Sequence, residues 1–423
     1  MNAFVQKLKL VFGDPTLRNR LLITLGLLVI SRMLAVIPIP GIDALKLQSL
    51  FSGNQFLSLL NMFSGGGLST LSIVMLGVGP YITASIIMQL MTLMIPSLKA
   101  MYQEEGDAGK RKFAQWSRFL TIPLAIVQGY SFILLFQKQG VLAAMSVSTL
   151  LIDLLVVVAG SMLLVWLGEL ISEFGAGNGI SLIIFAGIVS RLPANFGQLA
   201  FTFDASQIPV YVASVILVLL VIFGVVYVTE AERPIPVTYA KQSRTGASTG
   251  GMSTYLPLRV NQAGVIPIIF ALSILLFPQM ILQFLAGAKV VAVAHWATIF
   301  LGILTNQWFY ACAYFVLVFL FTYFYTAITF DPDQIATNLQ KSGAFIPGVR
   351  PGESTSTYIS TILTRLTLVG ATFLGAIAVL PLILKGITGN QSLAIGGTAL
   401  LIVVSVVIDL VKKIDAQISA REY

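Results

Sequence analysis

The residues in this chain that could do chemistry are few. Among its 423 residues there is one histidine, His295, and one cysteine, Cys312. A metal site needs several His, Cys or carboxylate ligands close together, and covalent catalysis needs a nucleophile beside a base. A single cysteine excludes a disulfide within the chain, and Cys312 lies in an apolar stretch where a packed thiol is expected. We therefore expect no enzyme activity, no cofactor and no metal site.

Charged side chains are also scarce. They make up 10% of the residues, hydrophobic residues make up 57%, and the mean hydropathy is +0.91, whereas soluble domains carry about 25% charged residues. This composition predicts a polytopic membrane protein. Within the apolar runs only Arg32 lies well away from an end, and it could reach the outer interface by snorkelling. The chain therefore lacks the intramembrane charges that usually mark ion and proton pathways.

A second kind of site is predicted from aliphatic side chains beside helix breaks. Because a ring of aliphatic side chains offers nothing to replace the hydration shell of an ion, a narrow apolar constriction excludes ions by dewetting. For each residue the alternative is ordinary apolar packing. The candidates are Val78 and Ile82 on one helix face, Ile180 and Ile184 after the glycine-rich break at 175–179, and Ile269 after Pro267.

The segment at 57–95 contains two glycine breaks, at Gly65–Gly67 and at Gly77–Pro80. A short helical piece is expected between them, from Leu68 to Leu76. It is shorter than the roughly 20 residues that span a bilayer, and non-helical backbone survives at membrane depth only beside protein or a water-filled cavity. We interpret it as a re-entrant helix in a cavity; a kinked membrane helix with a loop is the alternative.

Ten apolar runs are expected to span the membrane. With both chain ends in the cytoplasm, nineteen of the 25 Lys and Arg residues fall on the cytoplasmic side, as the positive-inside rule requires. A further run, Val290 to Thr305, is short and could lie along an interface. The expected spans are 20–37, 71–95, 119–136, 150–170, 180–190, 208–228, 263–284, 308–328, 362–384 and 393–411.

Two long cytoplasmic loops follow from this topology, from about Glu230 to Val260 and from about Thr329 to Ser360. The second contains GAFIPGVRPGEST, in which prolines and glycines shape a turn around Arg350. Such a loop suggests a docking surface, and the alternative is a solvated connector.

The chain also carries an internal echo. Gly77-Val78-Gly79-Pro80-Tyr81-Ile82 resembles Gly264-Val265-Ile266-Pro267-Ile268-Ile269, and each begins a predicted span from opposite sides of the membrane. This is the relation expected of inverted repeats, whose functional pathway lies at the repeat interface.

Several motifs together resemble the SecY family, the central subunit of the protein-conducting channel, over nearly the whole chain and in a form that looks bacterial. They are PIPGID at 38–43, NMFSGGGLS at 61–69, GPYITASIIMQL at 79–90, EFGAGNGISLIIFAGIV at 173–189, LPLRVNQAGVIPIIFA at 256–271, DPDQIATNLQKSGAFIPGVRPGEST at 331–355, TRLTLVGA at 364–371 and GGTALLIVVSVVID at 396–409.

The resemblance implies an all-α membrane protein of ten transmembrane helices in two inverted five-helix halves, expected at 1–205 and 206–423, with a re-entrant plug helix. It implies a lateral gate that includes Gln89 and Asn261. We infer that a hydrogen bond between these two residues could favour the closed state. It also implies a partner-docking role for Arg350, Lys241 and Arg244. The implied pore ring is Val78, Ile82, Ile180, Ile184, Ile269 and Ile402, and the plug, at about 61–72, includes Asn61, Met62, Phe63, Ser64, Gly65, Gly66, Gly67, Leu68 and Ser69.

The implied function is the passage of unfolded secretory polypeptides across the membrane and the lateral release of membrane segments into it. A small-solute secondary transporter is the alternative. The implied partners are SecE-like and SecG-like small subunits, a SecA-like motor, the ribosome, preproteins with signal sequences, and membrane lipid. No G-x-x-x-x-G-K-[ST] motif is present, so a partner or the membrane potential must supply energy. The loop at 240–254 has only Lys241 and Arg244 as basic residues, fewer than in many relatives, which leaves the balance of motor and ribosome contacts open. The expected location is the bacterial plasma membrane.

Overall fold

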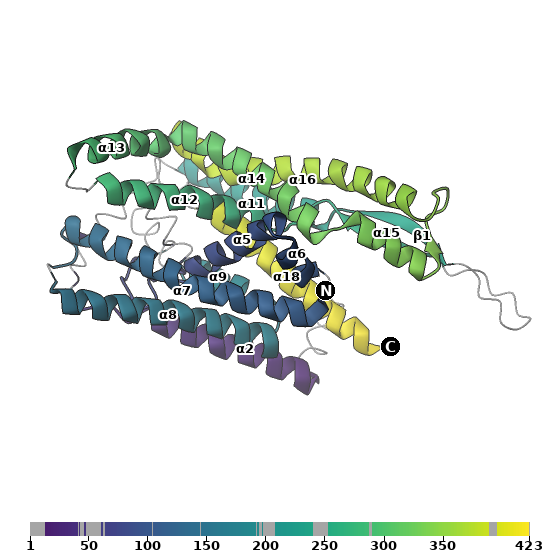
Figure 1. Cartoon of the computed structure of the whole chain (residues 1–423), viewed down its shortest axis with the longest axis horizontal. Coiled ribbons are helices and arrows are strands. Elements are labelled where there is room, and N and C mark those ends of the chain that lie inside the picture. Colours follow the sequence, from purple (N-terminus) through teal and green to yellow (C-terminus); the bar gives the residue numbers. More distant parts are fainter. Residues whose placement is uncertain are drawn as a thin grey trace, which may run out of the picture. The chain divides into compact units, whose positions relative to one another are not determined.

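The computed structural model describes residues 13–40, 42, 46–47, 61, 64–103, 105–143, 145–191, 193, 197, 208–239, 253–286, 290–388 and 396–422. These residues form mainly helices (Figure 1). The helices are α2 (Pro15–Leu34), α5 (Gly79–Met94), α6 (Pro96–Gln103), α7 (Gly106–Lys138), α8 (Val147–Phe174), α9 (Gly179–Val189), α11 (Ile208–Glu230), α12 (Ile266–Ala286), α13 (Val291–Thr305), α14 (Gln307–Thr329), α15 (Pro332–Lys341), α16 (Glu353–Thr388) and α18 (Gly396–Glu422), and the strands are β1 (Glu232–Tyr239), β2 (Ser253–Arg259) and β3 (Ala344–Phe345).

The chain forms two compact units. Unit 1 comprises Met1–Ala213, Ser273–Asn306 and Ile402–Tyr423, and unit 2 comprises Ser214–Leu272 and Gln307–Leu401. The halves expected at 1–205 and 206–423 stay a prediction, as does their inverted relation.

Every predicted span coincides largely with a helix, and Val290 to Thr305 forms the separate helix α13. Among the described residues, four helical stretches are long and apolar enough to cross a membrane: Ala108–Lys138, Val147–Phe174, Gln307–Lys341 and Glu353–Leu380. A fifth is counted if the bent pair α5 and α6, which meet at Pro96, is one span. The count of ten spans therefore stays a prediction.

The helical piece expected from Leu68 to Leu76 is wrong. Residues 64–78 form successive turns, and the helix begins only at Gly79. The backbone is left-handed at Gly65, Gly66 and Gly77 (φ 65°, 94° and 59°) and also at Leu71 (φ 43°). A right-handed helix needs a negative φ at every residue. These positions therefore interrupt it on both sides of the expected piece and within it.

The expected all-α class also needs a correction. Strands β1 and β2 pair antiparallel from Glu232 opposite Arg259 to Thr238 opposite Ser253, and β3 adds a short pairing at Thr238 and Tyr239. The prolines of β1 lie where β1 has β2 alone as a neighbour, so one of its edges has no ladder bond to lose. Both long polar loops therefore contribute regular structure to one sheet.

The core of unit 1 lies between α7, α8 and the turns before α5. Leu68, Leu71 and Met75 pack there with Phe136 and Val157, among other apolar side chains. Helices α2 and α7 each pack against α8, and the three run side by side in Figure 1.

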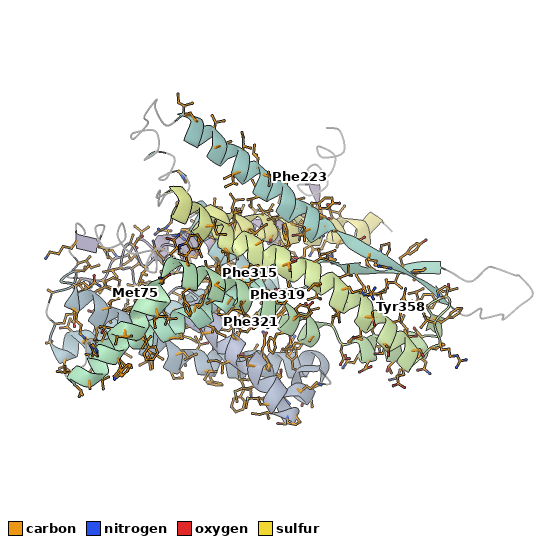
Figure 2. All side chains as sticks on the ribbon, turned by 90° about the horizontal axis from the view of Figure 1, so that it is seen from above. Met75, Phe223, Phe315, Phe319, Phe321 and Tyr358 are labelled. Atoms are coloured by element: carbon orange, nitrogen blue, oxygen red, sulfur yellow. The ribbon has the colours of Figure 1, made fainter. Side chains whose placement is uncertain are left out.

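The helical part of unit 2 is built on the pair α14 and α16. Figure 2 shows Phe315, Phe319 and Phe321 along α14. A side chain at Gly375 of α16 would approach the ring of Phe315 to 2.8 Å, so this glycine makes room for the aromatic ring. Strands β1 to β3, α15 and the first turns of α16 share a second apolar core that includes Ile235, Leu258, Ile346 and Ile359.

Candidate functional site

The predicted plug, residues 61–72, is called the plug segment below, and its C-terminal end is paired with the chain that follows α2. The Ile39 N–H donates to the Leu71 carbonyl at 2.9 Å, and the Ile73 N–H donates to the Ile37 carbonyl at 3.0 Å. Pro38 and Ser72 lie opposite each other in this antiparallel bridge. These backbone bonds hold the end of the plug segment in unit 1.

Within the plug segment, Asn61 organises the turns. Its side chain is buried, and its Oδ1 accepts a hydrogen bond from the Ser69 N–H at 2.9 Å. Its carbonyl accepts from the Gly66 N–H at 2.8 Å and from the Ser64 hydroxyl at 3.0 Å. An asparagine side chain that bonds nearby backbone in this way stabilises a turn in place of a helix.

Arg191, two residues after the end of α9, binds the same turns. Its Nη2 atom donates to Asn61 Oδ1 and to the Gly66 carbonyl, both at 3.0 Å, and it also contacts Ser69 Oγ. A side chain at Gly66 would meet Arg191 Nε at 2.9 Å, and its φ of 94° is unfavourable for any other residue. Gly66 therefore allows the guanidinium to approach the backbone.

Arg32 of α2 binds the neighbouring turn residue, because its Nη1 donates to the carbonyl of Gly65. Gly65 is also in close backbone contact with Gly187 of α9, since a side chain built at Gly187 would overlap Gly65. Arg32 of α2 and Arg191, just after α9, therefore hold two consecutive glycine carbonyls. The guanidinium of Arg32 thus has a hydrogen-bond partner within the protein and does not need to reach the outer interface by snorkelling.

A third attachment lies at the break before α5. The hydroxyl of Ser161, a fully buried residue of α8, donates to the Gly77 carbonyl at 2.8 Å. The preceding residue, Gly160, lies so close to Ile73 that a side chain there would overlap the Ile73 backbone. Helix α8 thereby fixes the chain immediately before Val78, a predicted ring residue.

Five of the six predicted ring residues are buried: Val78, Ile82, Ile184, Ile269 and Ile402. Ile180 is partly exposed, and its side chain lies against Gly168 of α8, where a side chain would meet Ile180 Cδ1 at 2.7 Å. Ile269 belongs to unit 2 and the other five belong to unit 1. The joint ring stays a prediction.

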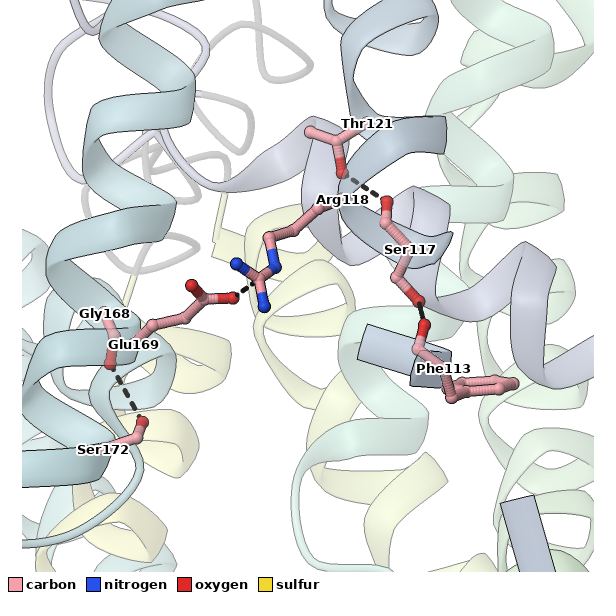
Figure 3. Close-up of polar contacts among 7 residues, drawn as sticks. All are labelled: Phe113, Ser117, Arg118, Thr121, Gly168, Glu169 and Ser172. Carbon is pink, nitrogen blue, oxygen red and sulfur yellow. Dashed lines mark hydrogen bonds and ion pairs between the residues drawn. The ribbon is translucent and has the colours of Figure 1, made fainter. Parts of the chain in front are cut away.

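An ion pair near Gly168 joins α7 to α8. Arg118 Nε lies 3.0 Å from Glu169 Oε1, and both side chains are partly exposed (Figure 3). On α8, Ser172 Oγ donates to the Gly168 carbonyl and accepts from the Gly179 N–H, each at 2.9 Å. Ser172 therefore links the last turn of α8 to the first residue of α9, and so helps to position Ile180.

The two predicted gate residues lie in different units. Gln89 is on α5, and Asn261 lies five residues before α12. Each has a buried side-chain oxygen with no hydrogen-bond partner in the described part of the chain. The expected bond between them stays a prediction.

Arg350 is exposed on unit 2, in the turn between β3 and α16. Its carbonyl accepts from the Thr355 hydroxyl at 2.8 Å, and Gly348 and Gly352 shape the turn with φ of 84° and 98°. Among the described residues, no partner binds its guanidinium. Lys241 and Arg244, and the plug residues Met62 and Phe63, lie outside the described residues.

Two residues of the site were not assigned to it from the sequence. The predicted topology places Arg191 on the outer side, outside the nineteen cytoplasmic charges, and gives Arg32 no partner beyond the outer interface. A lone arginine within an apolar helix is a signal of an internal partner, and this signal could have identified Arg32. Arg191 meets Asn61 across 130 residues of chain, and no spacing rule predicts such a contact.

Comparisons with known proteins give the same family over nearly the whole chain. The SecY family profile matches residues 72–411. The protein translocase subunit SecY of Mycobacterium tuberculosis is 42% identical over 100% of this chain and 99% of its own length. The corresponding subunit of Streptomyces coelicolor is 41% identical over 97% of each chain.

Solved structures share the fold. A protein-conducting channel aligns with a TM-score of 0.66 at 19% identity, covering 97% of this chain and 94% of that one. Sec61 in the canine ribosome–channel complex aligns with a TM-score of 0.62 at 18% identity over the same shares of the two chains. With relatives above 40% identity over the full length and a family match over most of the sequence, the chain belongs to the SecY family.

Proposed function

We propose that this chain is the subunit of a protein-conducting channel through which unfolded secretory polypeptides cross the membrane. Membership in the SecY family supports the proposal, and so does the fold it shares with solved protein-conducting channels. The transporter alternative loses support for the same reason.

The observation that carries the proposal is the attachment of the plug segment inside unit 1. Turns rich in glycine are held by polar bonds from α2, from α8 and from the arginine two residues after α9. They lie in the same unit as the buried aliphatic residues Val78, Ile82 and Ile184. A segment that is built of turns can leave without unfolding a helix. In a SecY structure of the same fold, the plug domain is described as stabilising the closed state of the translocation channel and maintaining a membrane seal.

The partners are part of the proposal. We infer a SecE-like and a SecG-like membrane subunit, and a SecA-like motor or the ribosome as the source of driving force. Sec61 and yeast Ssh1, which share the fold, were solved bound to ribosomes. The exposed Arg350 turn and the sheet of β1 to β3 on unit 2 offer a firm surface for such a partner.

The proposal also includes the membrane topology and the lateral gate. Ten spans with both termini in the cytoplasm of a bacterial cell would place the Arg350 turn on the side where motors and ribosomes act. A lateral gate containing Gln89 and Asn261 would release membrane segments into lipid.

The test is reconstitution. The chain, purified with its co-purifying small membrane subunit, is placed in liposomes and given a SecA-like motor, ATP and a preprotein with a signal sequence. We expect protease-protected preprotein to accumulate only with all components. If a complex that binds the motor protects no more preprotein than empty liposomes, the proposal fails. Uptake of a small solute against its gradient by the same liposomes would favour the transporter.

A further inference from the structure

We propose that Arg191 and Arg32 form a latch that sets how readily the plug segment leaves its seat. This inference rests on the proposed function, because it concerns the seal of the same channel. Arg191 acts here as a positioning residue, through the plug segment, and is not expected to contact the polypeptide while the plug is seated.

The latch pairs two positively charged side chains with neutral acceptors. Both arginines are partly buried, and among the described residues neither forms an ion pair with a carboxylate. Their hydrogen-bond acceptors include the carbonyls of Gly65 and Gly66 and the side chains of Asn61 and Ser69. A buried charge is costly unless it is hydrogen-bonded. The seated plug segment therefore supplies oxygens that the two guanidiniums would otherwise have to find in water.

The same geometry makes the latch reversible. The two guanidiniums bind consecutive residues, Gly65 and Gly66, and like charges held this close repel each other. Each bond ends on a neutral oxygen, which water or any other carbonyl can replace. A carboxylate at either position would bind more strongly and would hold the plug shut. We infer that this pairing favours a plug that is held at rest and yields when competing acceptors arrive.

The close approach of Arg191 and Gly187 to the plug segment explains why glycine residues occupy these contacts. Gly66 lets Arg191 reach its carbonyl, and the missing side chain of Gly187 lets that residue approach the backbone of Gly65. The attachment of the C-terminal end of the plug segment is different in kind, because it depends on backbone pairing with residues 37–39. Loss of the arginines should therefore free the Asn61–Ser69 turns while Ser72 stays paired.

The experiment measures plug release directly. Cys312 is exposed on α14, so the expectation of a packed thiol is wrong. The complex carries Cys312→Ser, which removes this native thiol, and Leu68→Cys, at a position only 1% exposed when the plug is seated. Labelling by a membrane-impermeant maleimide then reports release. We expect Arg191→Ala to increase the labelling rate at least tenfold, equivalent to about 1.4 kcal/mol. Arg191→Lys should give a smaller increase, because an ammonium keeps the charge and loses the planar fork.

Controls separate the latch from a general loss of structure. Lys46 also donates to a backbone carbonyl, but to that of Gly140, at 3.3 Å, and Gly140 is not part of the plug segment. Lys46→Ala should leave the labelling rate unchanged. Asn61→Ala removes one acceptor of Arg191, so adding it to Arg191→Ala should increase labelling less than the two separate effects predict. This cycle still decides the question if one variant assembles poorly.

An unchanged labelling rate in a folded Arg191→Ala complex would overturn the latch, as would equal increases for Arg191→Ala and Lys46→Ala. The labelling needs no motor and no substrate. If the unmodified complex translocates nothing, the proposed function fails, and the comparison of labelling rates still tests the latch by itself.

Discussion

Gly77 and Gly264 have the same left-handed backbone, with φ of 59° and 61°, and each lies two residues before a helix. In both places a bond of the same pattern follows: Ile82 N–H to the Val78 carbonyl at 3.1 Å, and Ile269 N–H to the Val265 carbonyl at 3.3 Å. The sequence echo between the two segments is therefore also an echo of local structure. A left-handed glycine sets the direction from which each helix starts.

This relation predicts the effect of replacing Gly264. Its Cβ would meet nothing within 4 Å, so only the backbone opposes a side chain. Gly264→Ala should lower the stability of the complex by about 1–2 kcal/mol, and Gly264→Asn by less, because asparagine tolerates this conformation. Thermal unfolding in detergent measures both. Gly302→Ala, in an equally open position within α13, is the control and should not destabilise. Equal stabilities of the alanine and asparagine variants would contradict the backbone argument.

Apolar runs and glycine breaks made much of this fold predictable. Helices α7, α8 and α14 follow long apolar runs, and the aliphatic residues beside the breaks are buried as expected of a seal or a core. The conformation at 64–78 was not predictable, because the left-handed Leu71 depends on pairing with residues 37–39, which are distant in sequence. The sheet was missed because β1 contains two prolines and its partner β3 lies about 100 residues away along the chain.

Ser161 is expected to be important for the start of α5. Ser161→Ala removes the only side-chain hydroxyl bonded to the Gly77 carbonyl among the described residues, at a fully buried position. Loss of such a buried bond costs about 1–3 kcal/mol, and we expect a lower unfolding temperature together with more ion leak through reconstituted channels. Ser131→Ala, whose hydroxyl bonds only within its own helix α7, is the matched control. Equal effects of the two substitutions would remove the special role of Ser161.

Polar substitutions at the predicted ring residues test whether they form an apolar constriction. Ile82→Asn, Ile184→Asn and Ile402→Asn each introduce hydrogen-bonding groups at a buried aliphatic site, which favours wetting of an apolar constriction. We expect more ion conductance per folded channel and looser discrimination of export signals. Ile184→Val keeps the site apolar and should keep the seal. If the asparagine variants reduce the yield of folded protein but conduct no more than the parent, these residues are packing residues.

Deletion of residues 61–71 tests the seal itself. The described residues from 64 to 71 form turns and no helix. We therefore expect the complex to assemble, with lower stability because Leu68 and Leu71 leave the core of unit 1, and to leak more ions at rest. Gly187→Ala is the finer test, because its side chain would overlap the Gly65 backbone and push the plug segment from its seat. Gly26→Ala, whose side chain meets nothing within 4 Å, is the control. Resting conductance in planar bilayers measures all three, and a Gly187→Ala channel as tight as the Gly26→Ala channel would place the seal elsewhere.

The Arg350 turn is expected to act through a partner. Its guanidinium is exposed and unbound among the described residues, while its backbone is held by the Thr355 hydroxyl. Arg350→Glu should therefore leave the turn and the unfolding temperature intact and abolish motor-driven translocation, because reversed charge repels a partner carboxylate. Arg350→Lys should be only partly tolerated, since lysine lacks the planar fork that binds a carboxylate with two bonds. Thr355→Ala is the opposite control: it should loosen the turn and lower stability while the charge remains.

Translocation per folded channel, with a purified SecA-like motor, separates a docking role of Arg350 from a structural one. Normal transport by the Arg350→Glu variant would rule out a docking role. If that variant is less stable but equally active per folded channel, the role of Arg350 is to stabilise the turn in which it lies.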